Sequence, residues 1–149
     1  MKEFKKILFP IDFSESTPKI LPYVKTMSQT FGAGVYLLYV VRDLKYLTSF
    51  HVPHPSLDLI EKEIAENSEK MMEKVCEEDL QGCPLFVKKI VVGDAANEII
   101  RYAGEIKADL IIMGTHGRKG LEKALFGSVA EQVVKNSPVP VLIINPYKV

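Results

Sequence analysis

Apolar residues follow two alternating patterns along this chain. Nearly continuous apolar runs lie at 4–11, 35–41, 85–92, 108–113 and 139–144. Runs of this length and composition are typical of strands that are buried on both faces of a sheet. Between them lie longer segments in which apolar residues recur every three or four positions, which predicts helices with one buried face. This alternation predicts an α/β fold with a parallel sheet covered by helices on both sides.

Residues that favour the starts and ends of helices support the first of these helices. The pattern predicts a helix over 14–31, with Ser16 or Thr17 as the N-cap and Gly32 just past the end. Pro22 lies inside this segment and removes one main-chain donor, so we expect it to disturb the helix.

The next two helices show clear apolar faces. A loop at 42–56 precedes a long charged helix. Its apolar face is predicted to hold Leu57, Ile60, Ile64, Met71 and Val75. Asp94 follows the third strand and is a suitable cap for the helix after it.

The connections between strands limit how the sheet can be ordered. Right-handed crossovers and one reversal of winding after the third strand give a five-stranded, doubly wound sheet of the flavodoxin or Rossmann type, with order 3-2-1-4-5. The first and fourth strands are then neighbours, so that Asp12 stands beside Gly114. Ligands of such folds bind beyond the carboxyl ends of the strands, where the winding reverses. We therefore expect a ligand site between these two residues.

Composition narrows the class of protein further. The 149 residues fit a single domain, 1–149, of which 47% are hydrophobic and 26% charged. Nineteen basic residues balance nineteen acidic ones, which gives no general electrostatic reason to bind nucleic acid or an anionic membrane. No apolar run approaches the roughly 18 residues that span a bilayer, and the N-terminal residues show no signal-peptide pattern. We expect a cytoplasmic protein.

A glycine-containing segment follows the fourth apolar run and carries the strongest chemical signal. Gly114 and Gly117 are followed, after nine residues, by Gly127 and Ser128. Glycines let the main chain approach a ligand closely, and the first turn of a helix offers unpaired N–H groups to phosphate. The glycines could instead simply end a strand and turn the chain. Ser128 is suited to cap the following helix and to donate its hydroxyl to phosphate.

Six ordered segments resemble the universal stress protein family in its ATP-binding branch. They are I-L-F-P-I-D at 7–12, L-L-Y-V at 37–40, V-V-G-D at 91–94, D-L-I-I-M-G-T-H-G at 109–117, G-S-V-A at 127–130 and S-P-V-P-V-L at 137–142. The resemblance covers nearly the whole chain. It implies a bound ATP, or ADP or AMP, accompanied by Mg²⁺ or Mn²⁺.

The resemblance also implies which residues hold the nucleotide. The base and ribose end would be lined by Pro10, Ile11, Asp12, Val40, Met113 and Gly114. The ribose and phosphates would be surrounded by His116, Gly117, Gly127, Ser128 and Val129. Ala130 stands where some members have a hydroxyl, which removes one phosphate contact. Arg118 could meet the outer phosphates, or it could be a solvated loop residue.

Two of these candidates have alternative roles. Asp12 could accept hydrogen bonds from a ribose or an adenine amine, or it could cap the following helix. His116 is more simply a residue that shapes the loop and contacts the ligand than a general base, because no orienting partner is visible in the sequence. We assign no catalytic residue and expect at most weak ATP hydrolysis.

Two histidines in the loop at 42–56 have a spacing compatible with metal ligation. His51 and His54 lie beside prolines, without a cysteine or a third evident ligand. We therefore interpret them as solvated loop residues and assign no metal site.

The last apolar run suggests a partner. The strand Val139–Ile144 is hydrophobic and lies at a sheet edge, and exposed edges invite pairing with another chain. In the resembled family this strand commonly forms a two-fold interface, so we expect a homodimer. The function implied is regulatory, with nucleotide occupancy controlling the loop at 115–126 and the dimer surface for an unknown downstream protein. The alternatives are a slow ATPase or adenylyl-transferring enzyme, and a nucleotide-free dimeric interaction module.

Overall fold

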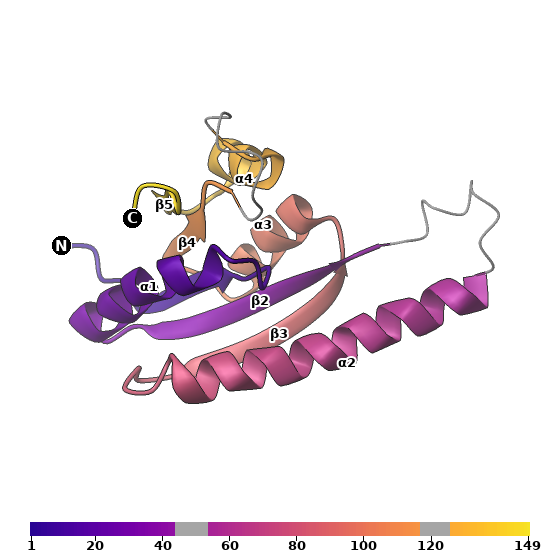
Figure 1. The fold of residues 1–149 in the computed structure, drawn as a ribbon. Coiled ribbons are helices and arrows are strands. Elements are labelled where there is room, and N and C mark those ends of the chain that lie inside the picture. Colours follow the sequence, from indigo (N-terminus) through magenta and orange to yellow (C-terminus); the bar gives the residue numbers. More distant parts are fainter. Residues whose placement is uncertain (44–53, 117–125) are drawn as a thin grey trace.

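The computed structural model describes residues 1–43, 54–116 and 126–149, in which five strands alternate with four helices (Figure 1). The strands are β1 (Lys6–Pro10), β2 (Gly34–Arg42), β3 (Phe86–Gly93), β4 (Leu110–Gly114) and β5 (Val141–Ile144). The helices are α1 (Thr17–Phe31), α2 (His54–Glu78), α3 (Ala95–Glu105) and α4 (Ser128–Asn136). None of the described helices is both long enough and apolar enough to cross a membrane.

The strands form one parallel sheet in the order β3-β2-β1-β4-β5, which confirms the predicted order. Ile7 in the central strand β1 is paired with Val35 on one side and with Leu110 on the other. The chain first winds outward from β1 to β3 and then returns to the other side of β1 with β4. The carboxyl ends of β1 and β4 therefore lie next to each other.

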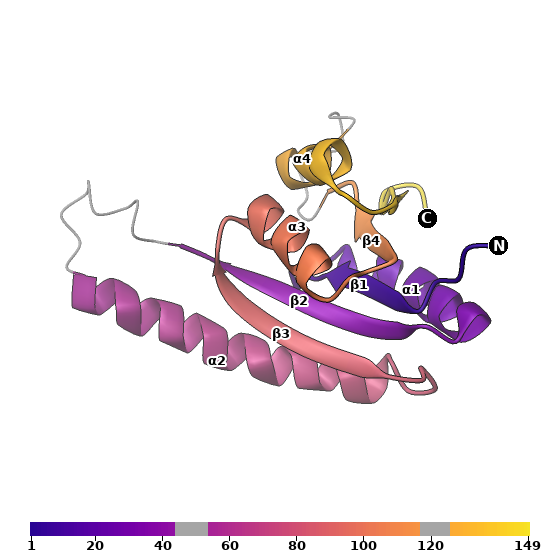
Figure 2. The same ribbon diagram turned by 180° about the vertical axis from the view of Figure 1, so that it is seen from behind.

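Helices cover both faces of the sheet, with α1 and α2 on one face and α3 and α4 on the other (Figures 1 and 2). Successive residues of a strand point to opposite faces, so that β1 contributes to two cores. Ile7 and Phe9 pack with α1 and α2, whereas Leu8 packs with α3 and α4. All three side chains are almost completely buried. Burial on both faces explains why the strands appear as continuous apolar runs in the sequence.

The ends of the helices agree only in part with the predictions. Gly32 has a left-handed φ of 62° at the C-terminus of α1, and Asp94 accepts a hydrogen bond from the Asn97 amide at 3.0 Å, as a cap does. Ser16 occupies the N-cap position of α1, but its side chain makes no capping hydrogen bond. Pro22 lies inside α1, which continues past it to Phe31.

The predicted apolar face of α2 is partly wrong. Ile60 and Met71 are exposed, with 43% and 47% of their surface accessible, whereas Leu57 is buried as predicted. The buried stripe in the C-terminal half of α2 follows steps of four residues through Ser68, Met72 and Cys76, and the next step reaches buried Leu80 just after the helix. Met72 lies one position from the predicted Met71, a rotation of about 100° around the helix axis. Two adjacent methionines leave this choice open in the sequence.

Candidate functional site

A cavity of about 690 Å³ opens at the carboxyl ends of the strands, where the winding of the sheet reverses. Its walls come from the ends of β1, β2, β3 and β4 and from the first residues of α1, α3 and α4. The volume lies within the range of ligand pockets, roughly 300–1,000 Å³. The location agrees with the ligand site expected from the order of the strands.

The structure gathers the predicted site residues around this cavity. The predicted residues that line it are Pro10, Ile11, Asp12, Val40, Met113, Gly114, His116, Gly127, Ser128, Val129 and Ala130. They come from β1, β2, β4 and α4 and from the turns beside them, so the fold alone brings them together. Gly117 and Arg118 lie outside the described residues. The binding roles of all these residues remain predictions.

Asp12 follows β1 and forms part of the turn into α1. Its Oδ1 accepts a hydrogen bond from the Ser14 amide at 2.9 Å and a longer one from the Thr17 hydroxyl at 3.5 Å. The predicted capping of α1 is therefore not found, because Ser16 is the N-cap and Asp12 instead holds the turn that precedes the helix. Among the described residues its Oδ2 has no hydrogen-bond partner, and the side chain is exposed at the cavity wall. One carboxylate oxygen thus holds the turn, and the role of Asp12 toward a ligand remains a prediction.

Three helices begin at the cavity, and their first turns differ in charge. The carboxylate of Asp12 lies at the start of α1, and that of Asp94 caps α3. The N-cap of α4 is Gly127, which has no side chain, and among the described residues no side-chain hydrogen bond caps this helix. Its first turn does contain one acid, Glu131, but this side chain is exposed and is not among the residues that line the cavity. Unpaired amides at a helix start carry a partial positive charge and favour anions. The start of α4 is therefore the part of the cavity best suited to phosphate.

Ser128 has a different place from the one predicted. It is the first residue of α4 rather than its cap, and its side chain is exposed. The predicted capping role is therefore wrong, because Gly127 takes the N-cap position with an extended backbone (φ −70°, ψ 162°). The hydroxyl of Ser128 is consequently not engaged as a cap. The predicted hydrogen bond from this hydroxyl to a phosphate remains a prediction.

Gly114 and Gly127 lie where a larger residue would crowd neighbouring atoms. A Cβ atom on Gly114 would lie 2.7 Å from Cδ1 of Ile20, and one on Gly127 would lie 3.1 Å from the Thr115 carbonyl oxygen. Neither has a left-handed φ; among the described glycines only Gly32 and Gly82 do. The expected benefit of positive φ therefore does not apply at these two positions. The close contacts shown here are with other parts of the protein, and close approach of the main chain to a ligand remains a prediction.

His116 is held inside the wall of the cavity and is not an exposed base. Only 4% of its surface is accessible, and its Nδ1 lies 2.8 Å from the Thr115 hydroxyl. Its ring also lies against that of Tyr147, with 5.7 Å between the ring centres. Within the described residues its Nε2 has no hydrogen-bond partner. These contacts favour a role in shaping the site.

The cavity also contains residues that the sequence analysis did not select. They are Ser16, Thr17, Tyr39, Arg42, Asp43, Asp94, Thr115 and Gln132, together with smaller apolar residues. Arg42, Asp43 and Asp94 could have been found from the sequence, because each lies at or just after the carboxyl end of a strand, and all these strand ends lie on the same side of the sheet. With Asp12 they give the side formed by β1, β2 and β3 three carboxylates and one guanidinium. Anionic groups of a ligand are therefore disfavoured there relative to the start of α4.

The described residues contain no group of three or more His, Cys, Asp or Glu side chains that could hold a metal ion. His51 lies outside the described residues, and the side chain of His54, the first residue of α2, is also outside them. The interpretation of these histidines as loop residues therefore remains a prediction.

A doubly wound parallel sheet with a cavity at the reversal of winding defines a class of ligand-binding α/β domains. Residues 3–145 match the Universal stress protein family. The chain belongs to this family.

Individual relatives agree with this assignment. The chain is 35% identical over 145 residues to the universal stress protein MJ0531 of Methanocaldococcus jannaschii, covering 97% of this chain and 84% of the relative. The solved structure of MJ0577 from the same organism has a TM-score of 0.80 at 34% identity, with 97% of each chain covered. UspA from Lactobacillus plantarum has a TM-score of 0.86 at 25% identity, covering 97% of this chain and all of that one.

Two more distant members share the fold and were solved with nucleotides. A universal stress protein in complex with cAMP has a TM-score of 0.63, and one from Archaeoglobus fulgidus in complex with dAMP has a TM-score of 0.65. Both are 19% identical to this chain, so the likeness concerns the fold. Nucleotide binding therefore occurs within the family.

Proposed function

We propose that this protein binds ATP, or the related ADP or AMP, in the cavity at the reversal of winding and acts as a regulatory protein. The observation that carries the proposal is the uncapped start of α4, which faces the same cavity as the Asp12 carboxylate. A nucleotide needs both environments, because its ribose and amine donate hydrogen bonds while its phosphates accept them. Members of the family in complex with cAMP and dAMP support an adenine nucleotide.

The distribution of charge orients the proposed ligand. The phosphates lie at Gly127, Ser128 and Val129, where main-chain amides are available. The adenosine lies toward the carboxylates that follow β1, β2 and β3, with Val40 against the base. The reverse orientation would bring the phosphates beside three carboxylates. Electrostatic repulsion therefore selects one direction for the nucleotide.

In this proposal Mg²⁺ or Mn²⁺ is held mainly by the phosphates of ATP and by water. Mg²⁺ commonly keeps several waters and binds through substrate phosphates. The proposal therefore requires no dedicated protein cage.

Regulation follows from what lies beside the site. The glycine loop at 115–126 joins the phosphate end of the cavity to α4, and α4 leads directly into β5 at the edge of the sheet. Nucleotide occupancy would thereby set the loop and the surface around Val139–Ile144. We propose that this edge pairs with a second copy in a two-fold dimer. Light scattering at micromolar concentration tests this point, and a monomer would contradict it.

The proposal is tested by thermal unfolding of nucleotide-free protein with ATP, ADP, AMP and GTP, each with and without Mg²⁺. A ligand at a hundred times its dissociation constant adds about 2.7 kcal/mol to the free energy of unfolding. For a chain of this size the midpoint should rise by roughly 5–10 °C. An adenine-selective rise supports the proposal. No shift with any nucleotide, on protein shown to carry no co-purified ligand, would contradict it and favour the interaction module.

A catalytic role has less support from the geometry. His116 is buried and its Nδ1 is engaged by Thr115, so the described residues give it no orienting carboxylate of the kind that a general base uses. ATP turnover that disappears in Asp12→Asn while ATP binding is retained would overturn this conclusion.

A further inference from the structure

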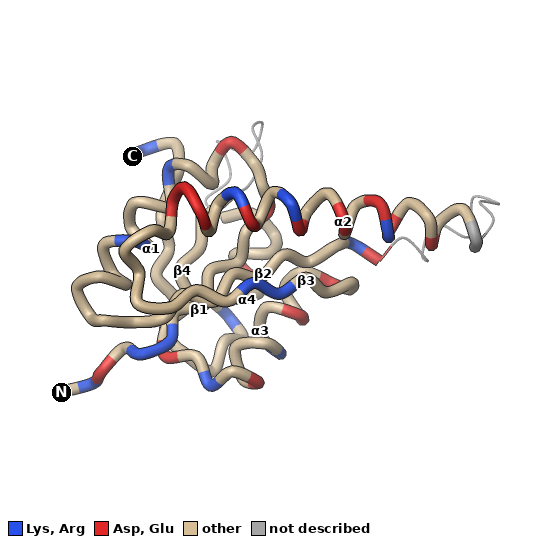
Figure 3. The backbone as a smooth tube through the Cα atoms, turned by 90° about the horizontal axis from the view of Figure 1, so that it is seen from below, with Lys and Arg blue, Asp and Glu red and all other residues tan. Residues whose placement is uncertain are grey.

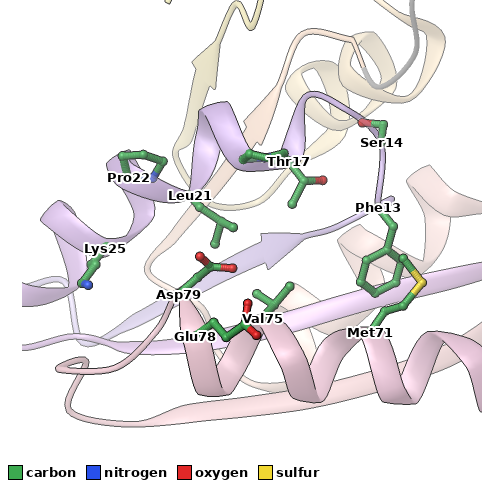
Figure 4. Close-up of a pocket in the computed structure, with 11 residues that line it drawn as sticks. Phe13, Ser14, Thr17, Leu21, Pro22, Lys25, Met71, Val75, Glu78 and Asp79 are labelled. Atoms are coloured by element: carbon green, nitrogen blue, oxygen red, sulfur yellow. The ribbon is translucent and has the colours of Figure 1, made fainter.

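A second cavity lies between α1 and α2, on the face of the sheet that these two helices cover (Figure 4). Its volume is about 470 Å³, and we call it the α1–α2 groove. The residues that line it are Phe13, Ser14, Thr17, Pro18, Leu21, Pro22 and Lys25 on one side and Met71, Val75, Glu78 and Asp79 on the other. It is separate from the cavity at the strand ends, although Thr17 contributes to both.

Each helix presents one face to the groove. The lining residues of α1 run from Thr17 to Lys25, and those of α2 and the residue after it run from Met71 to Asp79, a span of eight residue steps in each case. At 1.5 Å per residue this is about 12 Å, or two turns of a helix. The groove is therefore long enough to accept two apolar side chains spaced one turn apart on a third helix.

The middle of the groove is apolar. Leu21 of α1 and Val75 of α2 point into it, while Phe13 and Met71 lie together at one end (Figure 4). Met71 is about half exposed, so part of its apolar side chain is in contact with water. A partner that fills this space would bury apolar surface that the protein alone leaves accessible to water.

The other end of the groove is charged, with Glu78 at the end of α2, Asp79 directly after it, and Lys25 on α1 (Figure 4). Among the described residues these three side chains have no hydrogen bond or ion pair. Other acids of α2 differ, since Glu69 and Glu73 pair with Lys88. Two carboxylates against one amine leave this end with a net negative charge.

The position of these acids on α2 makes them unfavourable for the free protein. Glu77, Glu78 and Asp79 follow one another where α2 ends at Glu78, and the last turn contains no basic residue (Figure 3). The C-terminus of a helix carries a partial negative charge, so carboxylates there repel it and a cation is favoured. A positive charge placed in the groove would relieve this repulsion.

We propose that the α1–α2 groove is a docking site for a cationic amphipathic helix of a partner protein. Apolar side chains of that helix pack between Leu21 and Val75, and a lysine or arginine pairs with Glu78 and Asp79. Charge complementarity selects this occupant over an acidic or uncharged helix. The proposal concerns a different surface from the nucleotide site and does not depend on nucleotide binding.

The test uses a fluorescein-labelled 18-residue peptide of leucine and lysine at amphipathic helical spacing, titrated by anisotropy at 150 mM salt without nucleotide. The double variant Glu78→Gln/Asp79→Asn should weaken binding at least tenfold. The matched control Glu63→Gln/Glu66→Gln removes the same charge from the exposed N-terminal half of α2 and should change the affinity less than twofold. A leucine–glutamine peptide of the same spacing should bind at least tenfold more weakly to the natural protein.

A second variant locates the peptide. Val75→Phe places a ring in the groove without changing charge and should also weaken binding tenfold, with the thermal midpoint confirming that the variant is folded. If it does not fold, the exposed charge variants remain decisive. Equal losses in both charge variants would show general attraction to acid and overturn the proposal. So would equal binding of the uncharged peptide, or full binding to folded Val75→Phe.

Discussion

Ser128→Asp should raise the stability of the nucleotide-free protein and lower its affinity for ATP. Ser128 is the first residue of α4 and is exposed, so the new carboxylate disturbs no packing. A negative charge in the first turn of a helix stabilises it by about 0.3–1 kcal/mol. The same charge would stand beside the proposed phosphates. Opposite signs in the two measurements separate an anion site from a merely structural helix start.

The expected size of the effect follows from the position of the charge. Two unit charges about 6 Å apart, at an effective dielectric constant of about 40, repel by roughly 1.4 kcal/mol, which is a tenfold loss in affinity. ATP at a hundred times its natural dissociation constant would then add about 1.4 instead of 2.7 kcal/mol. The rise in midpoint should fall from roughly 5–10 °C to about 3–6 °C.

The assay is thermal unfolding of each variant with and without ATP at one fixed concentration. Asn136→Asp is the matched control, because it adds the same charge to the last residue of α4. It lies about 12 Å away along nine residues, beyond the screening length of about 8 Å at physiological salt. The control should lose slight stability and keep the full ATP shift. A full ATP shift in Ser128→Asp, or an equal loss in the control, would refute the placement of phosphate at α4.

Four further predictions concern stability and reactivity. Gly114→Ala should destabilise the protein by about 1 kcal/mol in urea unfolding, because its Cβ would lie 3.2 Å from the His116 carbonyl oxygen and would displace Cδ1 of Ile20, the flexible end of a side chain that borders the cavity. Asp94→Ala should cost about 0.5–2 kcal/mol in the same assay by removing the cap of α3, and Asp94→Asn should restore most of it. Burial raises the pKa of the Cys76 thiol, so a thiol reagent at pH 8 should label partly exposed Cys83 first. Because folding keeps Cys76 protonated, its contribution to stability should be full below about pH 8.5 and decline above it, which unfolding at pH 7 and 9.5 against Cys76→Ala measures.

The sheet could be predicted from the sequence because its strands are buried on both faces. Continuous apolar runs such as that around Leu8 have few alternatives, and the crossover rule leaves few orders of the strands. The predicted order, in which the winding reverses after the third strand, is the one found. Because the strands are parallel and in that order, the site residues come together at the carboxyl ends of the strands. Apolar periodicity was less decisive in α2, where Met71 and Met72 are equally apolar and only contacts with the sheet decide which is buried.

Local hydrogen bonds were the least predictable feature. Ser16 and Ser128 are residue types that commonly cap helices, yet neither caps one. In α4 the close approach of Gly127 to the Thr115 carbonyl fixes where the helix begins, and this contact joins residues that are twelve positions apart. The α1–α2 groove was also not anticipated, because it depends on how far apart two helices lie on the sheet.

A titration of ATP and Mg²⁺ into nucleotide-free, isotope-labelled protein, followed by amide NMR, tests the central claim most directly. The account predicts large, saturable shifts for the amides of Ser128, Val129 and Ala130 at the start of α4. It predicts little change at Gly82 and Lys107, which precede β3 and β4 and so lie at the amino ends of the strands, away from the cavity. Saturable shifts confined to the amino ends of the strands, or no shifts at millimolar ATP, would contradict this account.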